Sequence, residues 1–344
     1  MSSLQSCFLL LLGILLAPEL LLPLAAAQTM GAMDTHVRRT IPTEKEELII
    51  EGVCAAFLSR PSSEILASCG KLKSFIQVKN WEEAMGLAEK LGNLNPDNGL
   101  GCFWIGYIDL LQGKKTTAVK FLESAVEKSK DVSLAHINLG LGYLKIRQSR
   151  LFEKEMHWVI ENHPEDPRPY YFLGRFLAED LERLDEGAKY FQQAINRDPN
   201  DYRSRFHVGL TWEMKGELAQ AKAEYEMAVA LVDTSLATYA YPLEGLARLA
   251  WQQQNPSEAL HYAQKAVSLD PSLASGRLML GNLYLQTGAD EDAIAELKIA
   301  VHLDPADPAP HYMLARAYRK LKRSAEARQE EELFSQLKSS CQEK

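Results

Sequence analysis

The stretch ASGRLMLGNLYLQTGADEDAIAELKIAVHLDP, residues 274–305, contains the pattern on which the fold depends. Two amphipathic runs of helical spacing meet at a turn around Gly288, a residue that can adopt a left-handed backbone at little cost. The small residues Gly281 and Ala293 allow the two helices to cross closely. Pro305 has no amide proton with which to continue a helix. The stretch therefore predicts one helical hairpin that ends at this proline.

The same pattern recurs along the chain: a Leu-Gly or Leu-Ala pair and an aromatic residue in the first run, alanines in the second, and a proline at the end. Its copies begin near Ile65, Gly99, Ser133, Pro167, Tyr202, Ala240, Ala274 and Pro308. The pattern resembles the tetratricopeptide repeat (TPR) family, whose period is about 34 residues. The resemblance implies an all-α fold, a right-handed superhelical TPR solenoid of about eight helical hairpins over residues 65–341.

The composition and the motifs that the chain lacks exclude several classes of function. The formal net charge of the 344 residues is -8, which argues against a nucleic-acid partner bound through bulk positive charge. None of the common phosphate-loop, dinucleotide-binding, zinc-protease or serine-nucleophile motifs occurs in the sequence. We therefore expect a protein that is not an enzyme and that has no cofactor, no metal site and no small-molecule substrate.

Residues 1–27 differ in composition from the rest of the chain. An apolar run from Phe8 to Leu16 is followed by prolines and then by Ala25-Ala26-Ala27, which is typical of a secretory signal cleaved after Ala27. No Lys or Arg precedes the apolar run, so an uncleaved membrane anchor formed by residues 8–24 remains the alternative. We expect an exported protein, periplasmic or secreted, that contacts a membrane only if this segment is retained.

Residues 28–64 form the link between that segment and the repeats. The first part lacks periodicity and predicts an irregular lead-in, whereas residues 45–59 show helical spacing and predict a helix that caps the array. Cys54 and Cys69 are near enough in sequence to form a disulfide in an oxidising compartment. The alternative is a pair of buried free thiols.

In the TPR family the first helices line a concave groove that holds partner segments, and the resemblance implies the same function here. We assign the second, fifth, sixth, ninth, twelfth and thirteenth residues of each repeat to this groove. The candidate binding residues are Phe103, Trp104, Tyr107, Asn138, Arg168, Tyr171, Phe172, Arg175, Arg203, Phe206, His207, Arg248, Trp251 and Arg316. Arginines and aromatic rings together favour a protein or peptide partner that carries acidic groups or a free carboxyl terminus.

Three other interpretations remain open. The aromatic rings could pack between repeats while the arginines cover acidic side chains of the chain itself. The array could also serve as a structural or assembly subunit of an envelope or secretion-associated complex, or as an accessory subunit of an enzyme on another chain. Our main prediction is a non-enzymatic protein–protein interaction module that binds an extended or helical partner segment in the groove.

Overall fold

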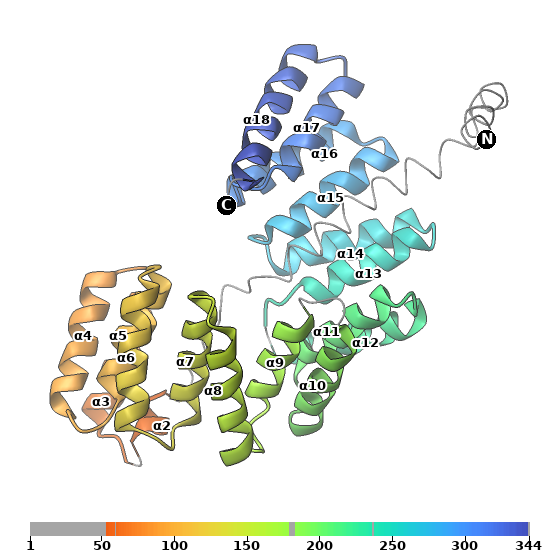
Figure 1. The fold of residues 1–344 in the computed structure, drawn as a ribbon. Coiled ribbons are helices and arrows are strands. Elements are labelled where there is room, and N and C mark those ends of the chain that lie inside the picture. The colour runs from red at the N-terminus through yellow and green to blue at the C-terminus, as the bar shows by residue number, and fades with distance from the viewer. Residues whose placement is uncertain (1–52, 59, 179–182, 236, 343–344) are drawn as a thin grey trace, which may run out of the picture. The chain divides into compact units, whose positions relative to one another are not determined.

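The computed structural model describes residues 53–58, 60–178, 183–235 and 237–342, with side chains as far as residue 339 (Figure 1). These residues form 17 α-helices and no strand. In chain order the helices are α2 (Val53–Phe57), α3 (Ser63–Gln77), α4 (Trp81–Leu94), α5 (Leu100–Leu111), α6 (Lys115–Lys128), α7 (Ser133–Lys145), α8 (Ser149–Asn162), α9 (Arg168–Ala178), α10 (Leu184–Arg197), α11 (Tyr202–Met214), α12 (Leu218–Ser235), α13 (Tyr241–Gln252), α14 (Pro256–Leu269), α15 (Ala274–Thr287), α16 (Asp290–Leu303), α17 (Ala309–Lys320) and α18 (Ser324–Gln342).

From α3 onward the helices form hairpins in chain order. Hairpin 1 is α3 with α4, hairpin 2 is α5 with α6, and the series continues to hairpin 8, which is α17 with α18. The second helix of each hairpin also contacts the first helix of the next one, as Figure 1 shows for α12 and α13. The described chain is therefore an all-α solenoid. The proposed signal segment and most of the lead-in lie outside the described residues.

Each connection that the structure describes between the two helices of a hairpin contains a residue with a left-handed backbone. Three of these residues are glycines, for which this conformation costs little, and four are longer residues that adopt it less readily. They are Lys79 (φ 56°), Gly113 (78°), Arg147 (61°), Gly216 (80°), Gln254 (58°), Gly288 (86°) and Lys322 (59°). The turn expected at Gly288 is thus a general feature of the array.

Within a hairpin, a glycine of the first helix faces a large side chain of the second. A Cβ atom added to Gly281 would lie 2.7 Å from Cγ of Leu297, and one added to Gly209 would lie 2.7 Å from Cδ1 of Tyr225. Leu297 and Tyr225 are both fully buried. The absence of a side chain at the glycine is what leaves room for the large residue between the two helices.

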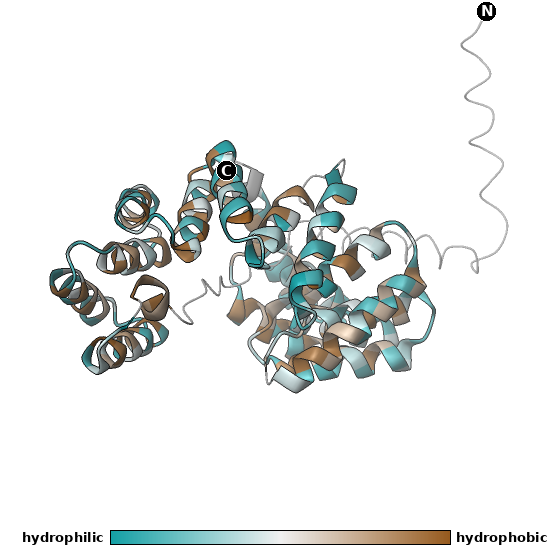
Figure 2. Cartoon of the chain, turned by 90° about the horizontal axis from the view of Figure 1, so that it is seen from below, coloured by the Kyte–Doolittle hydropathy of each residue, from teal (hydrophilic) through white to brown (hydrophobic). Residues whose placement is uncertain are grey.

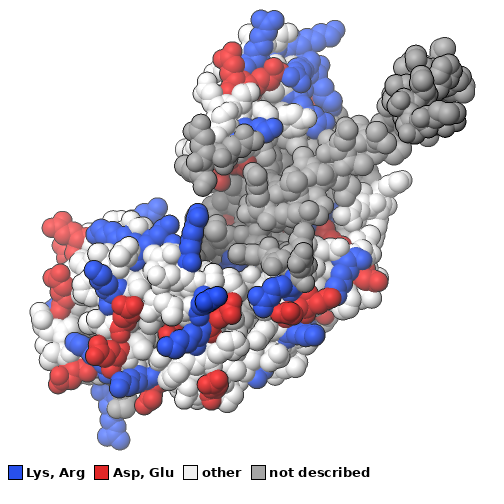
Figure 3. All heavy atoms as spheres, viewed as in Figure 1, with Lys and Arg blue, Asp and Glu red and all other residues white. Residues whose placement is uncertain are grey.

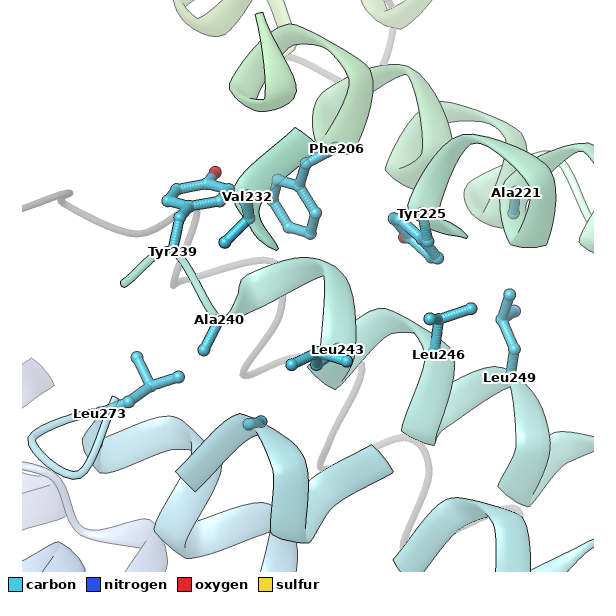
Figure 4. Close-up of a cluster of buried hydrophobic side chains, with 11 residues drawn as sticks. Phe206, Ala221, Tyr225, Val232, Tyr239, Ala240, Leu243, Leu246, Leu249 and Leu273 are labelled. Atoms are coloured by element: carbon cyan, nitrogen blue, oxygen red, sulfur yellow. The ribbon is translucent and has the colours of Figure 1, made fainter. Parts of the chain in front are cut away.

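The core continues from one hairpin to the next. Figure 4 shows Phe206 of α11 and Tyr225 of α12 facing Leu243 and Leu246 of α13, all of them buried in one hydrophobic cluster. Gly245 of α13 lies against the other edge of the Tyr225 ring, since an added Cβ would come within 2.5 Å of Cε2. One tyrosine thus fills the space between three helices. Figure 2 shows hydrophobic and hydrophilic residues on different sides of individual helices, as this packing requires.

A polar pair also joins the two helices of several hairpins. In each pair a basic residue near the start of the first helix contacts a glutamate 19 residues later. The pairs are His136–Glu155 (2.6 Å), Arg205–Glu224 (3.5 Å), Arg277–Glu296 (2.7 Å) and His311–Glu330 (2.6 Å). These pairs are not recognisable as a sequence motif, because their spacing is meaningful only once the hairpin register is known.

A disulfide joins Cys54 of α2 to Cys69 of α3, with 6.7 Å between their Cα atoms. Cys102 of α5 is a free, half-buried thiol. At the outer end of the array, the apolar side chains of Leu66, Val78 and Leu94 in and after α3 and α4 are 50%, 73% and 47% exposed. Among the described residues, no helix is long and apolar enough to cross a membrane.

Replacing Gly101 by Ala tests the close approach of helices. The new Cβ would lie 2.3 Å from the Cα atom of Gly92 in α4, so the backbones of α4 and α5 must separate. We expect a loss of about 1–3 kcal/mol in the free energy of unfolding, measured by urea titration followed by circular dichroism.

Gly86→Ala is the matched control. Gly86 is exposed on α4, and an added Cβ meets no atom within 4 Å. Because Ala favours a helix over Gly, this variant should gain about 0.5–1 kcal/mol. Equal effects of the two substitutions would contradict the role that we assign to close backbone contact.

Candidate functional site

The candidate site is the surface shared by the first helices of the hairpins, which we call the first-helix face. It is formed by the second, fifth, ninth, twelfth and thirteenth residues of each repeat. The predicted residues fall into three groups. Some are buried in aromatic contacts, some are paired with carboxylates of the chain, and some are only partly buried.

The fifth-position aromatic residues of hairpins 2, 4 and 5 are buried. Phe103, Tyr171 and Phe206 are 1%, 6% and 5% exposed. Phe206 stacks on Tyr225 with ring centroids 5.7 Å apart, and Phe103 stacks on Tyr107 at 6.3 Å. These rings contribute to the packing of the array along the face.

The assignment of the sixth position to the groove is corrected by the structure. Trp104, Asn138 and His207 are only 0%, 1% and 2% exposed. His207 stacks on Phe191 of the preceding hairpin, with 4.8 Å between ring centroids and 9° between ring planes. The Nδ2 atom of Asn138 donates a hydrogen bond to the carbonyl oxygen one helical turn earlier, at 2.8 Å. Packing against the neighbouring hairpin, as between His207 and Phe191, removes the sixth residue from solvent in these copies, whereas Phe172, at the same position, is half-buried.

Two of the candidate arginines are paired with carboxylates of the chain itself. Nε of Arg168 donates to both carboxylate oxygens of Asp166, at 2.7 and 3.0 Å, and its Nη2 donates to Oγ of Ser133 in the preceding hairpin at 3.0 Å. Arg168 therefore connects hairpins 3 and 4. The alternative interpretation, in which arginines cover acidic side chains, holds for this residue.

Arg248 forms the more buried of the two pairs. Its Nε and Nη2 donate to the two oxygens of Glu213 at 2.5 and 2.8 Å, and the hydroxyl of Tyr225 donates to the same carboxylate at 2.7 Å. The side chains of Arg248 and Glu213 are 9% and 8% exposed. Burial alone would lower the pKa of Arg248, but the Glu213 carboxylate holds it above its usual range. Burial, together with Glu213, raises the pKa of Tyr225. The pair is a structural link between hairpins 5 and 6.

Three other candidates, Arg175, Arg203 and Trp251, are only partly buried. Arg175 and Arg203 are half-buried, with their guanidinium carbons 5.8 Å from the ring of Tyr171 and 5.6 Å from the ring of Tyr202. Trp251 of α13 is also half-buried.

Hairpin 8 carries a group of aromatic and basic side chains that begins on the first-helix face, at the exposed residue Tyr312, and extends onto α18. Tyr312 is 41% exposed, the guanidinium of Arg316 lies 5.9 Å from its ring centroid, and the ring of Phe334 lies 5.5 Å away. Nζ of Lys338 lies 5.7 Å from the Phe334 ring. Among the described residues, no carboxylate comes within ion-pair distance of Arg316. We call these four residues the hairpin-8 patch, and Figure 3 shows several Lys and Arg side chains over this end of the array.

The model of one protein family matches much of the described chain. The tetratricopeptide repeat model matches residues 177–235, 245–308 and 291–334. Together with the hairpin array, these matches show that these segments of the chain are tetratricopeptide repeats.

Relatives and solved structures give a consistent account of the fold. The chain is 22% identical over 285 residues to superkiller protein 3 of Saccharomyces cerevisiae, covering 75% of this chain and 19% of that protein. It is 28% identical over 115 residues to the β-barrel assembly-enhancing protease of Yersinia pestis, covering 33% of this chain and 24% of that protein. The crystal structure of the APC/C hetero-tetramer Cut9-Hcn1 is similar, with a TM-score of 0.59 and 16% identity over 72% of this chain and 48% of that one. The chain thus spans less than a quarter of the length of superkiller protein 3 and of the β-barrel assembly-enhancing protease.

Removing the basic partner of Glu213 tests whether the Arg248 pair is structural. Arg248→Met leaves a buried carboxylate without its counter-charge, so we expect a loss of about 3–5 kcal/mol in the free energy of unfolding, measured by urea titration. Lys90→Met is the control, because the Lys90–Glu64 pair is 58% and 67% exposed. That substitution should cost no more than about 1 kcal/mol. A small effect at Arg248 would show that the pair is dispensable.

The burial of His207 predicts that the stability of the protein depends on pH. Burial, with a smaller contribution from Arg175, holds the pKa of His207 well below 6.5, and its Nε2 atom has no hydrogen-bond partner within the described part of the chain. Below about pH 6.5 the unfolded chain binds a proton at this residue that the folded chain does not bind. Stability therefore falls as the pH decreases, by about 1.4 kcal/mol per pH unit for this group.

His207→Phe keeps a ring on Phe191 and removes the titrating group. The stability lost between pH 7.5 and pH 5.5 should be smaller in this variant than in the wild type by about 1.4 kcal/mol, measured by urea titration at each pH. Parallel pH profiles for the two proteins would contradict the assignment.

Proposed function

We propose that this protein is a non-enzymatic interaction scaffold whose first-helix face binds an extended or helical segment of a partner protein. The TPR array supports the general role, and the hairpin-8 patch is the observation that supports a binding site on this face. The arginine Arg316 beside the exposed ring of Tyr312, which itself contacts Phe334, offers a charge together with apolar area that loses little conformational entropy on binding.

The charges along the face support a partner segment with acidic groups. Arg168 and Arg248 are neutralised by Asp166 and Glu213, so they are poor anchors for a carboxylate. Arg316 and Lys338 lie beside aromatic rings. A carboxylate that meets Arg316 can form a charge-assisted hydrogen bond while an adjacent apolar side chain covers Tyr312.

A photo-cross-linking experiment tests this proposal. A photoreactive phenylalanine analogue placed at Tyr312 should form discrete adducts with a partner protein in extract from the native cells, identified by mass spectrometry. Adding Arg316→Glu should reduce the adduct yield at least tenfold, which corresponds to about 1.4 kcal/mol. Raising the salt concentration should also reduce it, because accessible charges are screened.

The same analogue at Phe121 is the matched control. Phe121 is 37% exposed and lies on α6, a second helix. The proposal predicts no discrete adduct from this position. Equal adducts from Phe121 and Tyr312, or a yield from Tyr312 that does not change with Arg316→Glu, would contradict binding on the first-helix face.

A further inference from the structure

The short helix α2 occupies the first-helix face of hairpins 1 and 2. Cys69, to which Cys54 is joined by the disulfide, is the fifth residue of the first repeat. The ring of Phe57 contacts the ring of Phe103, the fifth residue of the second repeat, with 5.2 Å between ring centroids. The two anchors of α2 therefore meet equivalent positions in two successive hairpins.

Both anchors are buried in this arrangement. Cys54 and Cys69 are 5% and 6% exposed, while Phe57 and Phe103 are 8% and 1% exposed. Tyr171 and Phe206, the fifth residues of repeats 4 and 5, are also only 6% and 5% exposed, so it is the ring contact between Phe57 and Phe103, and not the low exposure of Phe103, that shows α2 lying against the face.

The helix is not itself a part of the repeat pattern. It has five residues, Val53–Phe57, and forms no hairpin with another helix among the described residues. A helix of this length is far below the size at which a helix is stable alone in water, so contacts outside α2 must stabilise it. Two of those contacts are the ring of Phe57 against Phe103 and the covalent bond between Cys54 and Cys69. A short segment held at a few anchor side chains is how a bound peptide sits on a helical groove.

We infer that hairpins 1 and 2 form a docking site for a short helix that presents one aromatic anchor among small residues, and that α2 fills this site in cis. This inference rests on the proposed function of the first-helix face. The sequence of α2, VCAAF, defines the chemistry of the occupant: a phenylalanine for the ring of Phe103, with alanines beside it that allow close approach. The disulfide keeps α2 at the site through a high effective concentration, so a partner helix of the same kind is excluded and partners are directed to the later hairpins.

A peptide-binding measurement on the full-length chain tests the inference. The probe is a fluorescein-labelled peptide of residues 51–60 with Cys54→Ser, which cannot form the disulfide. In fluorescence anisotropy it should bind a full-length Cys54→Ser/Phe57→Ala variant at least tenfold more tightly than it binds the disulfide-bonded wild type. Circular dichroism checks that the variant retains its helices.

Two further measurements locate the binding. Phe103→Leu in the same variant keeps an apolar side chain but removes the ring, and it should weaken the peptide at least fivefold, whereas Phe121→Ala on α6 should leave its affinity unchanged. The thiol of Cys69 is free in the Cys54→Ser/Phe57→Ala variant, so the bound peptide should slow its alkylation. Peptide mapping separates the alkylation of Cys69 from that of the other cysteines, Cys7, Cys102 and Cys341.

Each outcome decides the inference. Equal affinity for the wild type and the released variant, an affinity that does not respond to Phe103→Leu, or an alkylation rate at Cys69 that the peptide leaves unchanged would each overturn it. Cross-linking from Tyr312 depends on hairpin 8 and on the partner instead. If that cross-linking persists while the peptide fails to bind, the docking site alone is wrong and the proposed function stands.

Discussion

The fold depends on the close approach of two helices at a residue without a side chain. In hairpin 5, Gly209 leaves the space that the ring of Tyr225 fills, and in hairpin 6 Gly245 lies against the opposite edge of the same ring. Dispersion forces and the removal of apolar surface from water stabilise such contacts only when the atoms touch. The same contact recurs along the array, so each hairpin is stable mainly because its neighbours cover it.

This serial packing also determines what the first-helix face can offer. Many large side chains on the face, such as Phe206, are buried in the core. A buried arginine needs a counter-charge, and Glu213 provides it for Arg248. Accessible anchors therefore remain chiefly where the neighbouring side chains differ. The hairpin-8 patch lies on hairpin 8, and the α2 site lies on hairpins 1 and 2.

Much of the array could be predicted from the sequence, whereas most of the candidate site could not. The spacing of Leu-Gly pairs, alanines and prolines repeats with the hairpin and is independent of what lies beside it. Arg168 lies against the carboxylate of Asp166, whereas no carboxylate of the described residues lies within ion-pair distance of Arg316, and the period of the repeat does not encode this difference. The sixth position was misassigned because helical spacing gives a direction within one helix, but the neighbouring hairpin determines whether that direction leads to solvent.

The sequence alone determined the all-α class, the hairpin period and the TPR family, because these follow from local helix spacing and from the small residues that the close crossings need. Only the tertiary structure decided that His207 stacks on Phe191, that Glu213 neutralises Arg248, and that α2 covers Phe103. The physical reason is the same in each case. The two residues belong to different hairpins or segments, and their contact is created when the array folds.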